Sequence, residues 1–260
     1  MKYAVNISMI YADLPLLERL LRVRANGFQS IEFWFPSRMD LDLLARAQAD
    51  LGLATALFDF EPDQTHPHGH VASADGEEGF FRNLDYSLAL ANRLRCTRLN
   101  VLCGSRDETL SVAEQIELAV SRLARAAPAA ADAGVVLCVE GINRLDRPRA
   151  FVSTSALGFE IVDAVNSPHV RYQYDVYHMQ LMEGNLINTI RQNVHRIGHF
   201  QIADPPGRHE PGTGEVNIPA VLTCLGESGY DDWVSLEYLP SANSADPFAW
   251  LPLSERGGVR

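Results

Sequence analysis

The chain has 260 residues, of which 47% are hydrophobic and 21% are charged, and its formal net charge is −11. This composition is typical of a globular protein and excludes wholesale disorder. The negative charge argues against non-specific binding to nucleic acid or to anionic membranes, since both depend on positive charge. Among 22 basic residues only Lys2 is a lysine, which argues against Schiff-base and P-loop chemistry, because both require a lysine.

The four cysteines, Cys96, Cys103, Cys138 and Cys224, form no CxxC pair. We therefore expect four small buried thiols in a reducing compartment. The first apolar stretch is too short for a signal peptide, and no run approaches the roughly 20 residues of a membrane span. We expect a cytoplasmic protein that binds a small molecule and does not bind a membrane. Its oligomeric state stays open, and a homo-oligomer is possible.

Short apolar runs alternate with segments of helical periodicity. In chain order, the first half predicts strand Tyr3–Ile7, helix Leu14–Ala25, strand Ile31–Phe35, a helix capped by Asp40 and ending near Asp50, strand Leu53–Phe58, a polar loop over 61–78, a helix from Gly79 to about Leu94, and strand Arg98–Leu102. The second half predicts a long helix from Asp107 or Ser111 to Ala133, strand Val135–Val139, helix Ser155–Val165, strand Arg171–Tyr174, helix Leu181–Val194, strand Ile197–Ile202, helix Ile218–Ser228, and strand Trp233–Leu236.

Eight strands, each followed by a helical segment or by the tail, predict a parallel sheet, since parallel strands need crossover connections. Eight such units in this length predict a single α/β domain over residues 1–260, a (β/α)₈ TIM barrel. The rival is an open doubly wound sheet. It would normally carry a glycine-rich turn after the first strand, which the segment after Asn6 lacks.

Four consecutive predicted strands end on a side chain that can bind a metal ion. These side chains are Glu140, Asp175, Gln201 and Glu237. In a barrel the carboxyl ends of the strands share one face, where barrel enzymes place their chemistry. Three carboxylates and one amide oxygen favour Mg²⁺ or Mn²⁺ over Zn²⁺. A carboxylate after a strand can instead be a helix N-cap or a loop salt bridge, and His178, three residues after Asp175, faces either the same ligand or the protein core.

Several segments resemble hydroxypyruvate isomerases, which belong to the xylose-isomerase-like barrels. They are Asn6–Met9, Glu140–Asn143, Gln173–Gln180, Gln201–Asp204 and Glu210–Glu215. The resemblance implies that Glu140 and Glu237 are the two acid/base glutamates. It also implies metal ligands at Glu140, Asp175, Gln201 and Glu237, with Gln201 where ketose 3-epimerases carry His, and a substrate-binding role for His178.

The implied reaction interconverts hydroxypyruvate and tartronate semialdehyde by proton transfer through an enediolate, with a divalent metal ion as Lewis acid. Because the substrate is an anion and the chain is acidic, local cations must attract it, and the candidates are Arg208 and His209 in the loop after the seventh strand. The alternative for Arg208 is a loop salt bridge with Asp204 or Glu210.

The 61–78 loop departs from the family. Other members carry a Trp and a Gly-Glu-Arg-Gly stretch there, whereas this loop has no Arg between Phe58 and Phe80, so the exact substrate stays open. His66, His68 and His70 alternate in this loop, as a solvated segment or as a transition-metal site. Alternative functions are a 2-oxo-tetronate isomerase, a ketose 3-epimerase, a DNA-repair endonuclease and a non-catalytic sugar-binding barrel.

Overall fold

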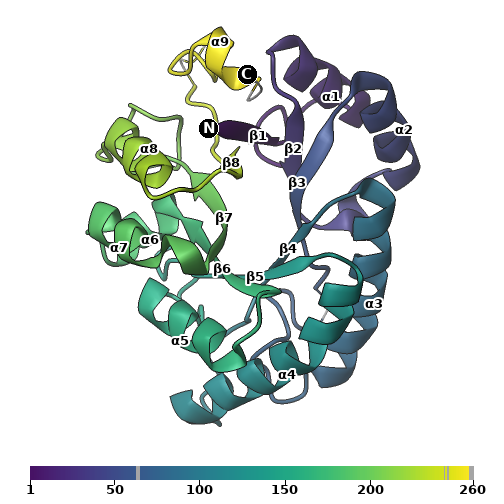
Figure 1. The fold of residues 1–260 in the computed structure, drawn as a ribbon, viewed down its shortest axis with the longest axis vertical. Coiled ribbons are helices and arrows are strands. Elements are labelled where there is room, and N and C mark those ends of the chain that lie inside the picture. The colour runs from purple at the N-terminus through teal and green to yellow at the C-terminus, as the bar shows by residue number, and fades with distance from the viewer. Residues whose placement is uncertain (63–64, 243, 245, 258–260) are drawn as a thin grey trace.

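The computed structural model describes residues 1–62, 65–242, 244 and 246–257, and it is a closed barrel of eight parallel strands in sequential order. The helices surround the barrel, as Figure 1 shows. The strands are β1 Lys2–Asn6, β2 Ser30–Phe33, β3 Ala54–Asp59, β4 Arg98–Val101, β5 Val136–Glu140, β6 Val170–Asp175, β7 Ile197–Ile202 and β8 Trp233–Leu236. The prediction of a (β/α)₈ barrel is confirmed.

The helices follow the predicted order. They are α1 Leu16–Ala25, α2 Leu41–Leu51, α3 Glu77–Leu94, α4 Val112–Asp132, α5 Ser155–Val165, α6 Val176–Met182, α7 Leu186–Asn193, α8 Ile218–Glu227 and α9 Leu253–Arg256, with 3₁₀ turns η1 Pro36–Arg38 and η2 Val194–Arg196. Asp40 caps α2 through the Leu43 amide, and Ser111, not Asp107, caps α4 with a reciprocal contact to Glu114. No described helix is long and apolar enough to cross a membrane.

The helix predicted over Leu181–Val194 is wrong in its start and in its continuity. Helix α6 begins directly after β6, because the Asp175 side chain accepts a hydrogen bond from the Tyr177 amide and so caps the first turn. The chain then breaks at Gly184, which has a positive φ of 61°, and α7 begins two residues later. The early start places His178 in the first turn of α6, next to the end of β6.

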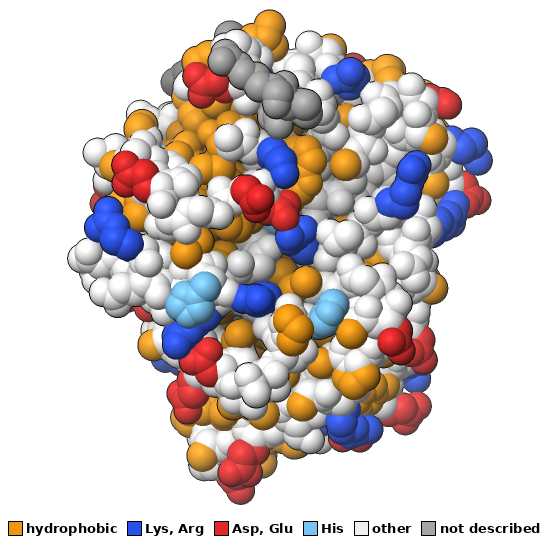
Figure 2. All heavy atoms as spheres, in the orientation of Figure 1, with side chains coloured by type: hydrophobic (Ala, Val, Ile, Leu, Met, Phe, Trp, Pro, Cys, Tyr) orange, Lys and Arg blue, Asp and Glu red, His pale blue; other side chains and the backbone are white. Residues whose placement is uncertain are grey.

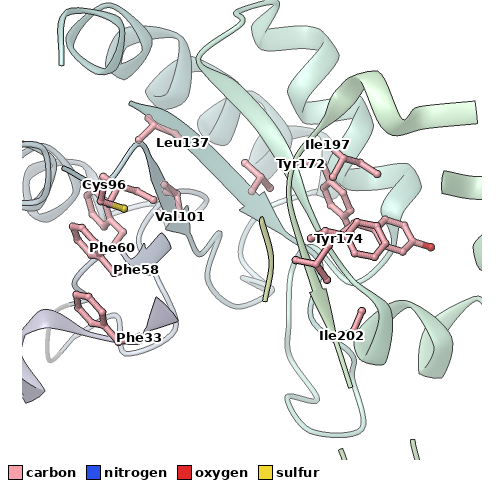
Figure 3. Close-up of a cluster of buried hydrophobic side chains, with 14 of the residues drawn as sticks. Phe33, Phe58, Phe60, Cys96, Val101, Leu137, Tyr172, Tyr174, Ile197 and Ile202 are labelled. Carbon is pink, nitrogen blue, oxygen red and sulfur yellow. The ribbon is translucent and has the colours of Figure 1, made fainter. Parts of the chain in front are cut away.

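Buried side chains between the strands and the surrounding helices form the core, and all four cysteines are buried free thiols, as expected. Part of this core is drawn in Figure 3, where Phe33, Phe58 and Phe60 lie next to one another. The rings of Phe33 and Phe58 stack 5.3 Å apart. On the outer surface in Figure 2, acidic and basic side chains are interspersed, so opposite charges lie close together on that face.

Tyr172 on β6 fills space that two glycines leave open. A Cβ atom at Gly158 in α5 would lie 2.1 Å from the Tyr172 ring, and one at Gly141 would lie 2.2 Å from the Tyr172 hydroxyl oxygen. That hydroxyl donates to the sulfur of Met179. Any side chain at either glycine would therefore displace the tyrosine, which lies directly behind the strand end that carries Glu140.

The loop between β3 and α3 covers residues 60–76, since the first two residues after it, predicted as loop, begin α3, and residues 63–64 lie outside the described residues. Its three histidines have different surroundings. The His66 ring contacts Asp75 at 2.8 Å, the buried His70 ring lies edge-on to Phe60, and His68 faces a cavity. Among described residues, these histidines do not form a group of three side chains close enough to hold one ion.

Buried Arg122 of α4 holds the second half of this loop in place. Its guanidinium group donates to the backbone carbonyls of His70 (2.7 Å), Val71 (3.0 Å), Ser73 (2.6 Å) and Ala74 (3.3 Å). Hydrogen bonds from a charged donor are stronger than neutral ones, so this single side chain fixes the backbone that borders the barrel opening.

We predict that Arg122→Met lowers the free energy of unfolding by about 3 kcal/mol, because two buried and two partly buried carbonyls lose a charged donor. Urea unfolding measures the change. Arg125→Met, one turn away, is the matched control. Its guanidinium pairs with Glu77 on the surface, so we expect a loss of at most about 1 kcal/mol. Equal losses for the two variants would contradict the role of Arg122.

Candidate active site

Each strand contributes one buried polar side chain to a ring at the carboxyl end of the barrel. Seven come from the strands and Glu237 directly follows β8. The members are Asn6, Glu32, Asp59, Asn100, Glu140, Asp175, Gln201 and Glu237, all at most 8% exposed. The four predicted metal ligands belong to this ring. Sequence reasoning missed the other four, although each is a lone polar residue within or directly after an apolar strand.

Glu140, Asp175 and His178 form the tightest group in the site. One potential ligand atom from each lies within 4.8 Å of the others, so this buried group could hold a metal ion. The His178 Nε2 atom is 3.5 Å from an Asp175 oxygen and 3.9 Å from a Glu140 oxygen. Asn100 donates to Glu140 at 2.7 Å and to Asp59 at 3.1 Å, which links the group to β3 and β4.

Asn143 sets the tautomer of His178. The Asn143 side-chain oxygen accepts from the amides of Leu145 and Asp146, so its NH₂ group faces the His178 Nδ1 atom at 2.6 Å. Nδ1 must then accept a hydrogen bond, and a neutral His178 carries its proton on Nε2, toward Glu140 and Asp175, so that in this tautomer Nε2 is a donor and not a metal ligand. Burial, with the positive charges of Arg208 and Arg147, holds the pKa of His178 well below its usual value. The ring is therefore a neutral donor that faces the site.

Arg208 lies between two carboxylates of the ring. Its Nη2 atom donates to Glu237 at 2.6 Å and to Asp175 at 3.1 Å. Glu237 also accepts from the Trp34 indole at 2.6 Å and from Asn6 at 3.1 Å. The alternative considered for Arg208, a salt bridge with Asp204 or Glu210, is absent from the contacts of these described residues. Arg208 instead acts as an internal counter-ion, and its Nε is buried without a hydrogen-bond partner.

The loop after β7 carries Arg208 in a fixed conformation. The Asp204 carboxylate accepts from the amides of Gly212 and Gly214 at 2.9 Å and of Val216 at 3.0 Å. Asp204 and His209 also form an antiparallel bridge, and Arg208 between them has a positive φ of 57°. This compact turn directs the Arg208 side chain back over the barrel opening.

Gln201 is oriented by a second buried group below the opening. Its Nε2 atom donates to Glu32 at 2.8 Å, and its oxygen accepts from Gln173 at 2.7 Å. Glu32 also contacts His199 at 2.7 Å and accepts from Asn6 at 2.8 Å. Burial alone would raise the pKa of Glu32, but the hydrogen bond and charge of His199 lower it. Glu32 therefore fixes which way the Gln201 amide points.

The carboxylates of the ring raise one another's pKa values. Burial, followed by the charge of Asp175, raises the pKa of Glu140 to about 7. Burial also raises the pKa of Glu237 and Asp175, against the opposing charge of Arg208, and burial with Glu140 raises that of Asp59. Burial would lower the pKa of Arg208, but Glu237 and Asp175 together raise it. The cluster thus favours an additional positive charge.

A cation fits the atoms at this end of the barrel. The available donors are carboxylate and amide oxygens, the ligands that Mg²⁺ and Mn²⁺ prefer. In addition, the Asn100 and Gln173 side-chain oxygens are buried without a hydrogen-bond partner. A buried, unpaired oxygen costs free energy, which a nearby cation would offset.

A cavity of about 300 Å³ opens above this cluster, which is the lower end of the usual range for a ligand pocket. Glu140, Glu237, His178 and Arg208 line it, so four of the predicted site residues face one space. Trp34 and Ile142 add apolar walls. The arrangement can bind a small polar molecule with a carboxylate on each side of it.

Comparison with known proteins gives the family. The family described as Xylose isomerase-like TIM barrel matches residues 20–252. A putative hydroxypyruvate isomerase from Streptomyces coelicolor is 37% identical over 98% of this chain and 97% of its own. A 2-oxo-tetronate isomerase from Cupriavidus necator is 34% identical over 96% and 97%.

Solved structures agree with this assignment. A structure titled AP endonuclease, family 2, from Brucella melitensis superposes with a TM-score of 0.91, at 33% identity over 96% of this chain and 97% of that one. The polar ring at the carboxyl ends of the strands and the full-length matches lead to the same conclusion. The chain is an isomerase and belongs to the hydroxypyruvate isomerase family of xylose isomerase-like TIM barrels.

Proposed function

We propose that this isomerase interconverts hydroxypyruvate and tartronate semialdehyde by moving a proton between adjacent carbons. The observation that carries the proposal is the pair Glu140 and Glu237, which come from β5 and from the end of β8 and line one cavity. Two carboxylates that flank a substrate can remove a proton at one carbon and return one at the next. The names of two full-length relatives, both hydroxypyruvate isomerases, support the same reaction.

We assign the acid/base roles to both glutamates. Asn100 is the one ring member that donates a hydrogen bond to Glu140, and it binds a single carboxylate oxygen. The other oxygen of Glu140 is therefore free to approach a substrate carbon. Glu237 is held by Trp34, Asn6 and Arg208, so its position is fixed more tightly. Burial of both groups excludes bulk water from the proton transfer.

The residues that would hold a divalent metal ion, Mg²⁺ or Mn²⁺, are Glu140, Asp175, Gln201 and Glu237. Such an ion supplies Lewis-acid stabilisation of the charge that develops on the substrate oxygens. Asp175 has a second task, since it caps α6 and thereby positions His178. The NH₂ group of Gln201 donates to Glu32, and its oxygen, which accepts from Gln173, keeps a second lone pair for the ion.

His178 and Arg208 are the proposed substrate-binding residues. The tautomer set by Asn143 makes His178 Nε2 a donor to a substrate oxygen. Arg208 retains an unpaired Nε–H that can donate to the substrate carboxylate, and its charge offsets that of an acidic substrate.

A second candidate reaction is the isomerisation of 2-oxo-tetronate, which the relative from Cupriavidus necator favours by its name. The same glutamates could serve either acid, because the proton moves between the same two carbons next to the carboxylate. An assay of hydroxypyruvate, 2-oxo-tetronate and neutral ketoses with Mg²⁺ and Mn²⁺ decides between them. Turnover of ketoses alone would contradict both reactions.

We predict that Glu140→Gln and Glu237→Gln each lower turnover by about 10²–10⁴-fold, the usual contribution of a positioned proton-transfer group. The wild type should incorporate solvent deuterium at the substrate carbon, as measured by NMR. Glu160→Gln, exposed on α5, is the matched control and should leave turnover unchanged. Product formation without any solvent exchange would favour a hydride shift instead.

We predict that Asp175→Asn weakens the binding of Mn²⁺ at least tenfold, because a hard cation loses one formal charge among its ligands. Isothermal titration with Mn²⁺ measures the effect without any need for activity. Asp132→Asn, at the exposed end of α4, removes the same charge far from the site. If the two variants bind Mn²⁺ equally well, Asp175 is not a ligand.

We predict that Arg208→Met raises the KM for hydroxypyruvate at least tenfold and that for a neutral ketose much less, since only the acid loses a charged partner. Steady-state kinetics on both substrates measures the difference. Arg208 also pairs with Asp175 and Glu237, so equal losses on both substrates would show damage to the site and would argue against carboxylate binding.

A further inference from the structure

A second cavity, of about 400 Å³, adjoins the one above the polar ring. Glu140, Ile142, His68 and Arg147 line both, so the two spaces share a wall. We call the second cavity the side chamber. It extends between the loops that follow β4 and β5, and Ser105, Arg149 and Ala150 line its far part. A molecule whose reacting carbons lie at Glu140 can therefore continue into the side chamber.

The wall of the side chamber holds two basic and two acidic side chains, and its arginines form no ion pair with the acids, Glu140 and Asp146. Arg147 and Arg149 both lie in its wall, and neither guanidinium forms an ion pair or hydrogen bond with another described residue. One nitrogen of Arg147, Nη1, is buried without a partner. The nearest acid, Asp146, accepts instead from Asn143 at 2.9 Å and from Tyr177 at 3.4 Å.

The two arginines also affect their neighbours. Burial, followed by the charges of Arg147 and Arg149, lowers the pKa of His68, which lies in the same wall as both guanidinium groups. A neutral His68 and the Ser105 hydroxyl add hydrogen-bonding groups without negative charge. A guanidinium that is partly buried and unpaired is a ready partner for a carboxylate or a phosphate, which it can bind through two parallel hydrogen bonds.

We propose that the side chamber binds a terminal anionic group of a substrate longer than hydroxypyruvate. The substrate class is a 2-oxo sugar acid of four or more carbons whose far end is a phosphate monoester or a second carboxylate. The proposal rests on the proposed function, because the reacting end stays between Glu140 and Glu237. A three-carbon acid fills only the cavity above the ring and leaves Arg149, which lines the side chamber alone, without a partner.

Kinetics on acids of equal length tests the proposal. The substrates are four-carbon 2-oxo acids that end in a hydroxyl, a carboxylate or a phosphate group. We expect the wild type to have a KM at least tenfold lower for one of the charged ends than for the hydroxyl end. Arg147→Gln should remove most of this preference, because charged hydrogen bonds to the anion are lost. The charged substrate with the lower KM shows whether the side chamber prefers a phosphate or a carboxylate.

Arg191→Gln is the matched control, since Arg191 is exposed on α7 and its removal changes the net charge equally. It should leave the preference for the charged end intact. Arg149→Gln serves as a second variant if Arg147→Gln fails to fold, and it should reduce the same preference. An equal KM for all three ends in the wild type would overturn the proposal.

Binding without turnover separates this proposal from the proposed function. The probe is a four-carbon aldonic acid 4-phosphate, which has no 2-oxo group to enolise, measured by isothermal titration. One outcome is that the probe binds tightly, Arg147→Gln weakens this binding at least tenfold, and no 2-oxo acid is turned over. This outcome supports anion binding in the side chamber and contradicts the proposed reaction. If hydroxypyruvate is turned over, and the wild type and Arg147→Gln bind the probe equally well, only the proposal of anion binding in the side chamber is contradicted.

Discussion

Five carboxyl groups from five strands share the dry carboxyl end of this barrel, and the remaining features of the site follow from how their charge is balanced. Glu32, Asp59, Glu140, Asp175 and Glu237 are all buried. Charges of one sign in a medium of low dielectric repel strongly unless cations or hydrogen-bond donors compensate them. Arg208 supplies one cation from a loop, and its reach depends on the backbone turn that Asp204 organises. A bound divalent ion would supply the rest.

The ring divides into a closed half and an open half. Around Glu32, the side chains of Asn6, Gln201 and His199 all contact the carboxylate across the barrel. Around Glu140, by contrast, the protein provides fewer donors, and both cavities reach the carboxylate. The closed half makes the geometry rigid, and the open half is where a ligand can complete the contacts. Preorganised polar groups of this kind lower the cost of reorganisation during a reaction.

The fold was predictable from the sequence because parallel strands and their helices have distinct periods and alternate without exception. Half of the polar ring was predictable as well, because Glu140, Asp175, Gln201 and Glu237 end strands at intervals of one βα unit. Asn6, Glu32, Asp59 and Asn100 were not recognised. Each is a single polar residue among apolar neighbours. Its role becomes visible only in the closed barrel, where Glu32 of β2 contacts His199 and Gln201 of β7 across the interior.

The contacts of Arg208 were beyond sequence reasoning for a related reason. Its partners, Asp175 and Glu237, are 33 and 29 residues away along the chain, whereas the acids considered, Asp204 and Glu210, are close in sequence. Local spacing favoured the near residues, but the turn built on Asp204 already uses that carboxylate for backbone amides. The early start of α6 was missed because Asp175 serves both as a helix cap and as a member of the ring.

The contact of Tyr172 with two glycines makes substitutions at three positions that are distant in sequence depend on one another. Its ring occupies the place of a side chain at Gly158, and its hydroxyl occupies the place of one at Gly141. A lineage could acquire alanine at either glycine only after the tyrosine became smaller, and a smaller residue there would leave a void behind Glu140 until the glycines changed in turn. Substitutions at 141, 158 and 172 should therefore arise together, and a laboratory search that varies one position at a time would not find the alternative packing.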